Sequence, residues 1–87
     1  MISKSYSLTD ARQIVVAADN IHRTVYLNIV GNATAYLGGA DVTDSNGLPK
    51  VKHTSATAIV VPAGETLYAV MATGETETLR VLLPDLD

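Results

Sequence analysis

The sequence contains no cysteine, no tryptophan and no phenylalanine. Without cysteine the chain can form neither a disulfide framework nor a thiolate metal site, which excludes a disulfide-stapled miniprotein. Its only aromatic residues are four tyrosines, so valine, leucine, isoleucine and alanine carry most of the 47% hydrophobic content. A small core without large aromatic rings gains stability from association with a partner or with copies of itself. We therefore expect an oligomer.

Positive charge is also scarce. Six lysines and arginines are scattered along the chain against nine acidic residues, which leaves a net charge of −3. A nucleic-acid partner would require a clustered basic patch, which is absent, so we expect none. No apolar stretch follows Lys4 to make a signal peptide, and no apolar run approaches the ~20 residues that span a bilayer. We expect a soluble protein with no membrane partner and no export signal.

Short strands joined by tight turns account for most of the chain. The clearest is Arg23–Val30, in which apolar and polar residues alternate, as expected of a strand with one buried face. Further strands are predicted at Gln13–Ala17, Ala33–Gly38, Lys50–Thr54, Ser55–Val61, Thr66–Ala72 and Glu77–Leu83. About six to seven short strands without helical periodicity indicate a β-sandwich or a small barrel. Of these we predict a small antiparallel β-sandwich, either immunoglobulin-like or jelly-roll-like.

Turn residues predict how these strands connect. Gly31-Asn32 is a strong hairpin signal between Arg23–Val30 and Ala33–Gly38. Such a hairpin would place Tyr26 and Tyr36 near each other, either as a cross-strand pair or as part of an interface, where half-exposed tyrosines are frequent. The triplet Gly-Glu-Thr occurs at 64–66 and again at 74–76, which indicates the same turn used twice.

The loop Gly39–Pro49 is the most turn-rich segment and a natural place to look for a site. Gly38-Gly39 is not followed by the Gly-Lys-Ser/Thr of a phosphate-binding loop, so it indicates a bulge or a close backbone approach. A calcium loop starting at Val42 would end at His53, and neither supplies the acidic ligand required there. We interpret the loop as an exposed connection.

Other candidates for chemistry are equally isolated. His22 and His53 have no spacing to carboxylates that would make a metal site, so a structural or solvated role is expected for both. No nucleophile–base pair is recognisable either. The sequence therefore predicts no catalytic residues, no metal and no cofactor.

Residues 1–12 lack sustained alternation and are expected to form an N-terminal arm outside a single β-sandwich domain at 13–87. Such an arm could become ordered on a neighbouring subunit or another partner. The residues predicted to contact a partner are therefore Ile2, Tyr6 and Leu8 in the arm, Tyr26 and Tyr36 in the strands, and Asp41 in the loop.

Several segments together resemble small all-β virion proteins of tailed bacteriophages, particularly those infecting actinobacteria. These segments lie between residues 23 and 83: Val25-Tyr26-Leu27-Asn28, Ala35-Tyr36-Leu37-Gly38-Gly39-Ala40-Asp41-Val42-Thr43, Asn46-Gly47, Pro62-Ala63-Gly64-Glu65-Thr66-Leu67-Tyr68-Ala69-Val70 and Leu79-Arg80-Val81-Leu82. The resemblance implies a non-enzymatic structural part of the particle. Within that class it implies a capsid decoration (cement) protein on the capsid surface, commonly a homotrimer, that binds the major capsid protein and is assembled in the bacterial cytoplasm.

Two alternatives belong to other classes. Related modules in tails and head fibres make a binding domain for a host glycan the second hypothesis, which Tyr26 and Tyr36 support as aromatic contacts. A small enzyme is the third, and it lacks a recognisable constellation of catalytic residues.

Overall fold

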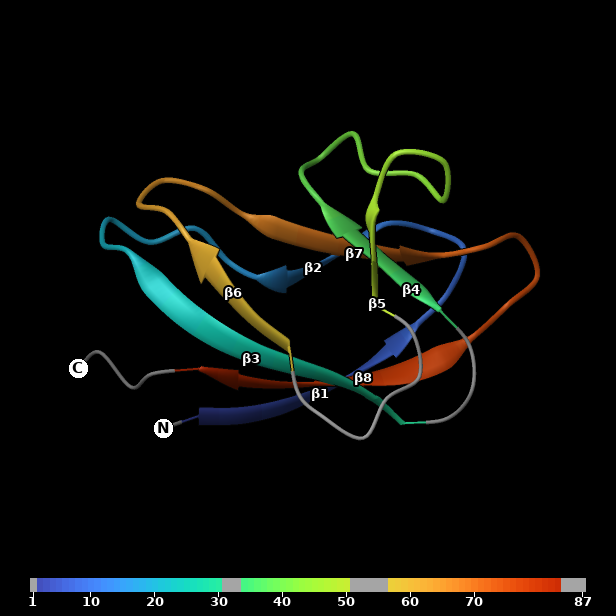
Figure 1. The fold of residues 1–87 in the computed structure, drawn as a ribbon, viewed down its shortest axis with the longest axis horizontal. Coiled ribbons are helices and arrows are strands. Elements are labelled where there is room, and N and C mark those ends of the chain that lie inside the picture. Colours follow the sequence, from blue (N-terminus) through green and yellow to red (C-terminus); the bar gives the residue numbers. More distant parts are fainter. Residues whose placement is uncertain (1, 31–33, 51–56, 84–87) are drawn as a thin grey trace.

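In the described part of the chain, eight strands form two four-stranded antiparallel sheets that pack face to face (Figure 1). The computed structural model describes residues 2–30, 34–50 and 57–83. In sheet A the strand order is β1 (Ile2–Leu8), β8 (Glu77–Leu83), β3 (Arg23–Val30) and β6 (Thr57–Val61). In sheet B it is β2 (Gln13–Val16), β7 (Leu67–Met71), β4 (Ala35–Gly38) and β5 (Leu48–Lys50). The predicted antiparallel β-sandwich is confirmed.

The pairing of the strands identifies the topology as a jelly roll. β1 pairs with β8, β2 with β7, β3 with β6 and β4 with β5, which is the pattern of one long hairpin. Rolling that hairpin up adds the pairs β3–β8 and β4–β7. This double Greek-key arrangement is the jelly roll, so the immunoglobulin-like alternative is wrong.

The hairpin predicted at Gly31-Asn32 is not formed. β3 and β4 belong to different sheets, so consecutive strands here are packed across the sandwich and are not hydrogen-bonded to each other. Gly31 and Asn32 themselves lie outside the described residues. The prediction failed because a two-residue turn signal is local, whereas burying the apolar faces of both strands requires two facing sheets.

The predicted N-terminal arm is instead an edge strand of the domain. All of β1 pairs with β8, from Ile2 opposite Leu83 to Leu8 opposite Glu77. Leu8 is fully buried in the core, and Tyr6 packs against it. The segment alternates after all, because serines at positions 3, 5 and 7 point away from the core. Two exposed residues at the start of the strand, Ile2 and Lys4, hide this pattern.

The core lies between the two sheets and follows the alternation of the central strands. Val25, Leu27 and Ile29 of β3 are buried, and so are Leu79 and Val81 of β8. They meet apolar residues of sheet B, among them Val15, Ala35, Leu37, Ala69 and Met71. Aliphatic side chains thus make up most of this core, as expected for a chain without tryptophan or phenylalanine.

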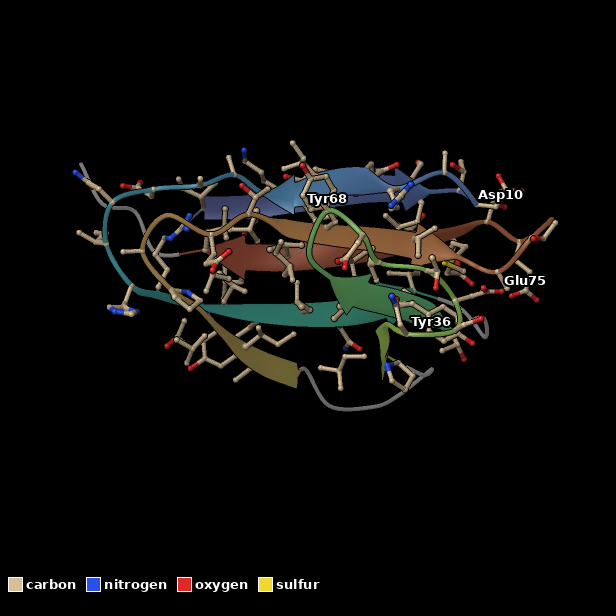
Figure 2. All side chains as sticks on the ribbon, turned by 90° about the horizontal axis from the view of Figure 1, so that it is seen from above. Asp10, Tyr36, Tyr68 and Glu75 are labelled. Carbon is tan, nitrogen blue, oxygen red and sulfur yellow. The ribbon has the colours of Figure 1, made fainter. Side chains whose placement is uncertain are left out.

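Hydrogen bonds between loops tie each end of the sandwich. At one end Gly64 N donates to Asp19 O at 2.6 Å, and the buried Arg23 guanidinium donates to Ala17 O at 2.6 Å and Glu65 O at 3.3 Å. At the other end Gly74 N donates to Asp10 Oδ2 at 3.2 Å. Asp10 and Glu75 mark this second end in Figure 2. These bonds join the connections that cross between the sheets.

The repeated triplet forms the same turn twice, as predicted. Glu65 N donates to Pro62 O at 3.1 Å and Glu75 N donates to Ala72 O at 3.0 Å. Gly64 and Gly74 both have a φ of 82°, the left-handed conformation required at the third position of a type II turn.

Gly64→Ala should lower the free energy of unfolding by about 1 kcal/mol because an L-residue is strained at that φ. A Cβ at this position would meet nothing within 4 Å, so the cost is conformational and not steric. Gly64→Asn should cost less, since asparagine tolerates the left-handed region better than alanine. Urea titration followed by circular dichroism measures both variants, and equal losses would contradict this explanation.

Candidate functional site

The outer face of sheet A carries an open groove with a volume of about 550 Å³. This volume falls within the ~300–1,000 Å³ of typical small-molecule sites. Strands β1, β8 and β3 supply its floor and walls through the side chains that alternate away from the core. The outward-pointing residues that line it are Ser3, Ser5, Tyr26, Asn28, Arg80 and Leu82.

The strand register arranges these side chains in two rows across the sheet. Leu82 lies between Ser3 and Tyr26 in the first row, and Arg80 lies between Ser5 and Asn28 in the second. Neighbouring strands are about 4.8 Å apart, and diagonal neighbours on one face are about 7–8 Å apart. Tyr26 and Arg80 are such diagonal neighbours. The small serines along β1 leave the space that forms the groove.

Arg80 is the only charged residue among the described outward-facing residues of sheet A. Its side chain is exposed and makes no hydrogen bond or ion pair with another described residue. On the adjacent strand, Asn28 Oδ1 accepts a bond from Ile29 N at 3.0 Å, while its amide nitrogen has no partner among the described residues. The groove thus presents hydrogen-bond donors without a carboxylate beside them.

Sheet B presents a different outer face because the loop after β4 folds back over it. Val42 in this loop is 2% exposed, and Val70 beneath it is 5% exposed. Neither belongs to the core between the sheets, so they form a second, smaller apolar cluster. Arg12 donates to Ala40 O at 2.7 Å and tethers the loop to the start of β2. The loop is exposed at residues 39–41 and 43–46, as interpreted from the sequence, and the buried Val42 anchors it on sheet B.

Within the loop, the segment tested for calcium binding is a set of turns. Asn46 Oδ1 accepts hydrogen bonds from Thr43 N at 2.7 Å and Thr43 Oγ1 at 3.2 Å. Gly47 N donates to Thr43 O at 2.9 Å.

The bulge predicted at Gly38-Gly39 is not present, because β4 pairs regularly with β7 as far as Gly38. The alternative prediction, a close approach, is correct: a Cβ on Gly38 would lie 3.0 Å from Val42 Cγ2.

The residues predicted to contact a partner are dispersed over the molecule. Tyr26 is 43% exposed in the groove of sheet A, whereas Tyr36 is half-buried on the outer face of sheet B. Figure 2, which looks onto sheet B, shows Tyr36 and Tyr68 on the near side. The predicted proximity of Tyr26 and Tyr36 is therefore wrong. Asp41 is exposed in the loop over sheet B, and Ile2 is 38% exposed at the start of β1.

Leu8 belongs to the interior and is not on an exposed surface, whereas Tyr6 is only partly covered. Leu8 has no exposed area, and Tyr6 is half-buried against the core. The groove residues that the sequence analysis missed are Ser3, Ser5, Asn28, Arg80 and Leu82. The alternation within each strand places them on outward faces, but only the pairing of β8 with both β1 and β3 brings them together.

Among the described residues, no group of three histidines, cysteines or carboxylates could hold a metal ion. His22 is exposed, and His53 lies outside the part of the chain that the structure describes. The same described ranges contain no helix long and apolar enough to cross a membrane. Comparison of the chain with known protein families, with curated proteins and with solved structures found no significant match.

Proposed function

We propose that the chain is a structural protein of a phage virion, a capsid decoration protein that binds the outer shell as an oligomer. The resemblance of residues 23–83 to small β virion proteins supports the class. The contrast between the edges of the two sheets supports the assembly and is the structural observation that carries the proposal. A jelly roll is also an architecture that viral capsid domains use.

The edges of sheet B are blunted in ways that prevent pairing with another chain. β2 has four residues, and its register shifts between Ile14 and Val16. β5 has three residues, one of which is Pro49. Short edge strands, bulges and proline are the devices by which proteins protect free edges from other strands.

The edges of sheet A carry less protection: neither strand has a proline or a bulge, and Lys4 in β1 is the only charged residue on either of them. β1 pairs with β8 through seven residues in continuous register and contains no proline. β6 pairs with β3 through five residues, none of them charged, and Val60 on its outer face is 61% exposed. Unprotected edges expose backbone donors and acceptors that another strand can satisfy. Sheet A is therefore suited to extension by a second copy.

Pairing of β1 from one copy with β6 from the next joins two different surfaces, so the contact is heterologous. Such contacts close into rings when the rotation between copies permits. A ring of three copies would leave no free edge on sheet A and would present one common surface to a shell. The assembly proposed for this protein is such a trimer.

Val60→Lys should convert the trimer to a monomer, because it places a charge on β6, which has none, and would set a second lysine against Lys4 in the proposed β1–β6 pair. Ile14→Lys is the matched control: Ile14 is 49% exposed on an edge strand of sheet B, and its variant should remain trimeric. Light scattering coupled to size-exclusion chromatography measures the mass of each. A monomeric wild-type protein, or equal effects of both variants, would contradict the proposed assembly.

The role on the shell is tested with expanded empty capsids of the phage whose genome encodes the chain. The wild-type protein should co-sediment with them and raise the temperature at which they open, as measured by scanning calorimetry. Val60→Lys should bind more weakly, because a monomer loses the avidity of the trimer. A trimer that fails to bind these capsids would overturn the decoration role while leaving the assembly intact.

A further inference from the structure

We propose that the groove on the outer face of sheet A is a binding site for a saccharide that carries a carboxylate group. The site lies on the outer face of the sheet and uses side chains, whereas the proposed assembly uses backbone groups along the edges, although Ser3 and Ser5 of the groove belong to the edge strand β1. The inference does not depend on the capsid role. It rests on the kinds of side chain in the groove, on their spacing and on the charge of Arg80, which has no partner among the described residues.

The apolar part of the groove suits the face of a sugar ring. Tyr26 is 43% exposed and lies directly opposite Leu82 on the neighbouring strand. An accessible aromatic ring offers a flat apolar surface with a polar hydroxyl at its tip. The C–H groups on one face of a six-membered sugar ring can pack against that surface. Leu82 extends the contact toward β1.

The polar part of the groove supplies hydrogen-bond partners for sugar hydroxyls. The hydroxyls of Ser3 and Ser5 both donate and accept, and the amide nitrogen of Asn28 donates. Ser3 lies opposite Leu82, while Ser5 and Asn28 lie on either side of Arg80. An extended ligand lying across the strands would therefore meet Ser3, Leu82 and Tyr26 in one row, and polar groups on both sides of Arg80 in the other.

Arg80 determines the charge of the ligand. Its guanidinium has no partner among the described residues, and it is the only charge among the described outward-facing residues of this sheet. Arginine binds carboxylates through two parallel hydrogen bonds in a planar geometry. Arg80 lies about 7–8 Å diagonally from Tyr26, so a sugar ring on the tyrosine can direct an exocyclic carboxylate to the arginine.

Tyr26 and Arg80 are residue types enriched at protein interfaces, but the serines and the alanine around them favour a smaller occupant. Protein interfaces are depleted in serine and alanine relative to the rest of the surface. Here Ser3, Ser5 and Ser7 form one side of the face, and Ala58 lies opposite Tyr26 on the other. Two copies of the chain could also pack with these faces of sheet A against each other. Arg80 would then meet no carboxylate, because the described outward-facing residues of sheet A include neither aspartate nor glutamate. A small, hydroxyl-rich anion satisfies the groove better.

The test compares cellouronate oligosaccharides with cello-oligosaccharides of the same length and linkage. The two probes differ in carrying a carboxylate or a hydroxymethyl group on each ring. Isothermal titration calorimetry of the full chain should detect cellouronate binding at millimolar concentrations and binding at least about tenfold weaker for the neutral probe, because charge-assisted hydrogen bonds are the strong ones. No binding, or equal binding of both probes, would overturn the proposal.

Variants of the chain test whether the groove is the binding site. Control variants elsewhere show whether a change in net charge, or the loss of an exposed apolar side chain, is enough to weaken binding. Arg80→Gln and Tyr26→Ala should each weaken cellouronate binding about tenfold or more. Ser45→Asp gives the same change in net charge as Arg80→Gln but lies in the loop over sheet B, and Ile14→Ala removes an equally exposed apolar side chain from β2. Both control variants should bind as the wild type does. If the controls weaken binding as much as the groove variants, the carboxylate is recognised elsewhere and the assignment is wrong.

Discussion

Leu27→Ala is expected to lower the free energy of unfolding by about 2–5 kcal/mol, the range for truncating a buried leucine. Leu27 has no exposed area and lies in the middle of β3, the strand that pairs with both β8 and β6. A domain of 87 residues has a total stability of about 4–13 kcal/mol. The substitution should therefore remove a large fraction of the total stability.

The neighbouring residue provides a matched control for this prediction. Tyr26 precedes Leu27 in the same strand but points outward and is 43% exposed, so Tyr26→Ala should cost less than about 1 kcal/mol. Urea unfolding followed by circular dichroism compares the two variants. The measurement is made in the Val60→Lys background and at one protein concentration, because association would add to the apparent stability. Similar losses for Leu27→Ala and Tyr26→Ala would contradict the placement of the core on one face of β3.

The strands could be predicted because alternation is a local property. Both Arg23–Val30 and Glu77–Leu83 were predicted with the bounds that the structure gives. The apolar residues that alternate in Arg23–Val30, namely Val25, Leu27 and Ile29, are buried, and Arg23 on the same face is buried with them. Alternation of apolar and polar residues can be recognised within one strand without knowing its partner, since it reflects only which face of that strand meets the core.

Pairing could not be predicted in the same way, because it depends on the rest of the chain. Gly31-Asn32 favoured a hairpin, and the structure separates its two strands into different sheets. The groove was missed for the same reason. Arg80 and Tyr26 lie 54 positions apart in the sequence and become neighbours only because β8 pairs with β3. Sites built from several strands of a jelly roll therefore require its topology before their residues can be recognised.

The edge strand at the N-terminus shows a further limit of local patterns. Ser3, Ser5 and Ser7 alternate with residues that face inward, yet only Tyr6 and Leu8 among those are shielded from solvent. Small polar residues on one side of a strand give a weak signal, because alternation is recognised mainly by apolar side chains. In this protein the same serines that obscure β1 also create the space for the groove.

The loop over sheet B leads to the second large effect: Gly47→Ala should lower the free energy of unfolding by about 2–3 kcal/mol, as expected for overpacking. A Cβ on Gly47 would lie 2.6 Å from Tyr36 Cβ, 2.8 Å from Val42 Cγ2 and 3.0 Å from Thr43 O. None of these atoms is the free end of a long side chain, so the loop itself must move. The small apolar cluster beneath it would then be opened.

Gly39→Ala is the control for that prediction, because it lies in the same loop and its added Cβ would meet only Asp41 Oδ1, at an ordinary 3.5 Å. Its stability should stay within about 0.5 kcal/mol of the wild type, as for most surface substitutions. Hydrogen exchange of the Val70 amide should separate the two variants further, with faster exchange in Gly47→Ala if the loop lifts from β7. Equal stability and equal hydrogen exchange in the two variants would contradict this prediction. They would show that the packing of the loop, including the buried Val42, does not stabilise the outer face of sheet B.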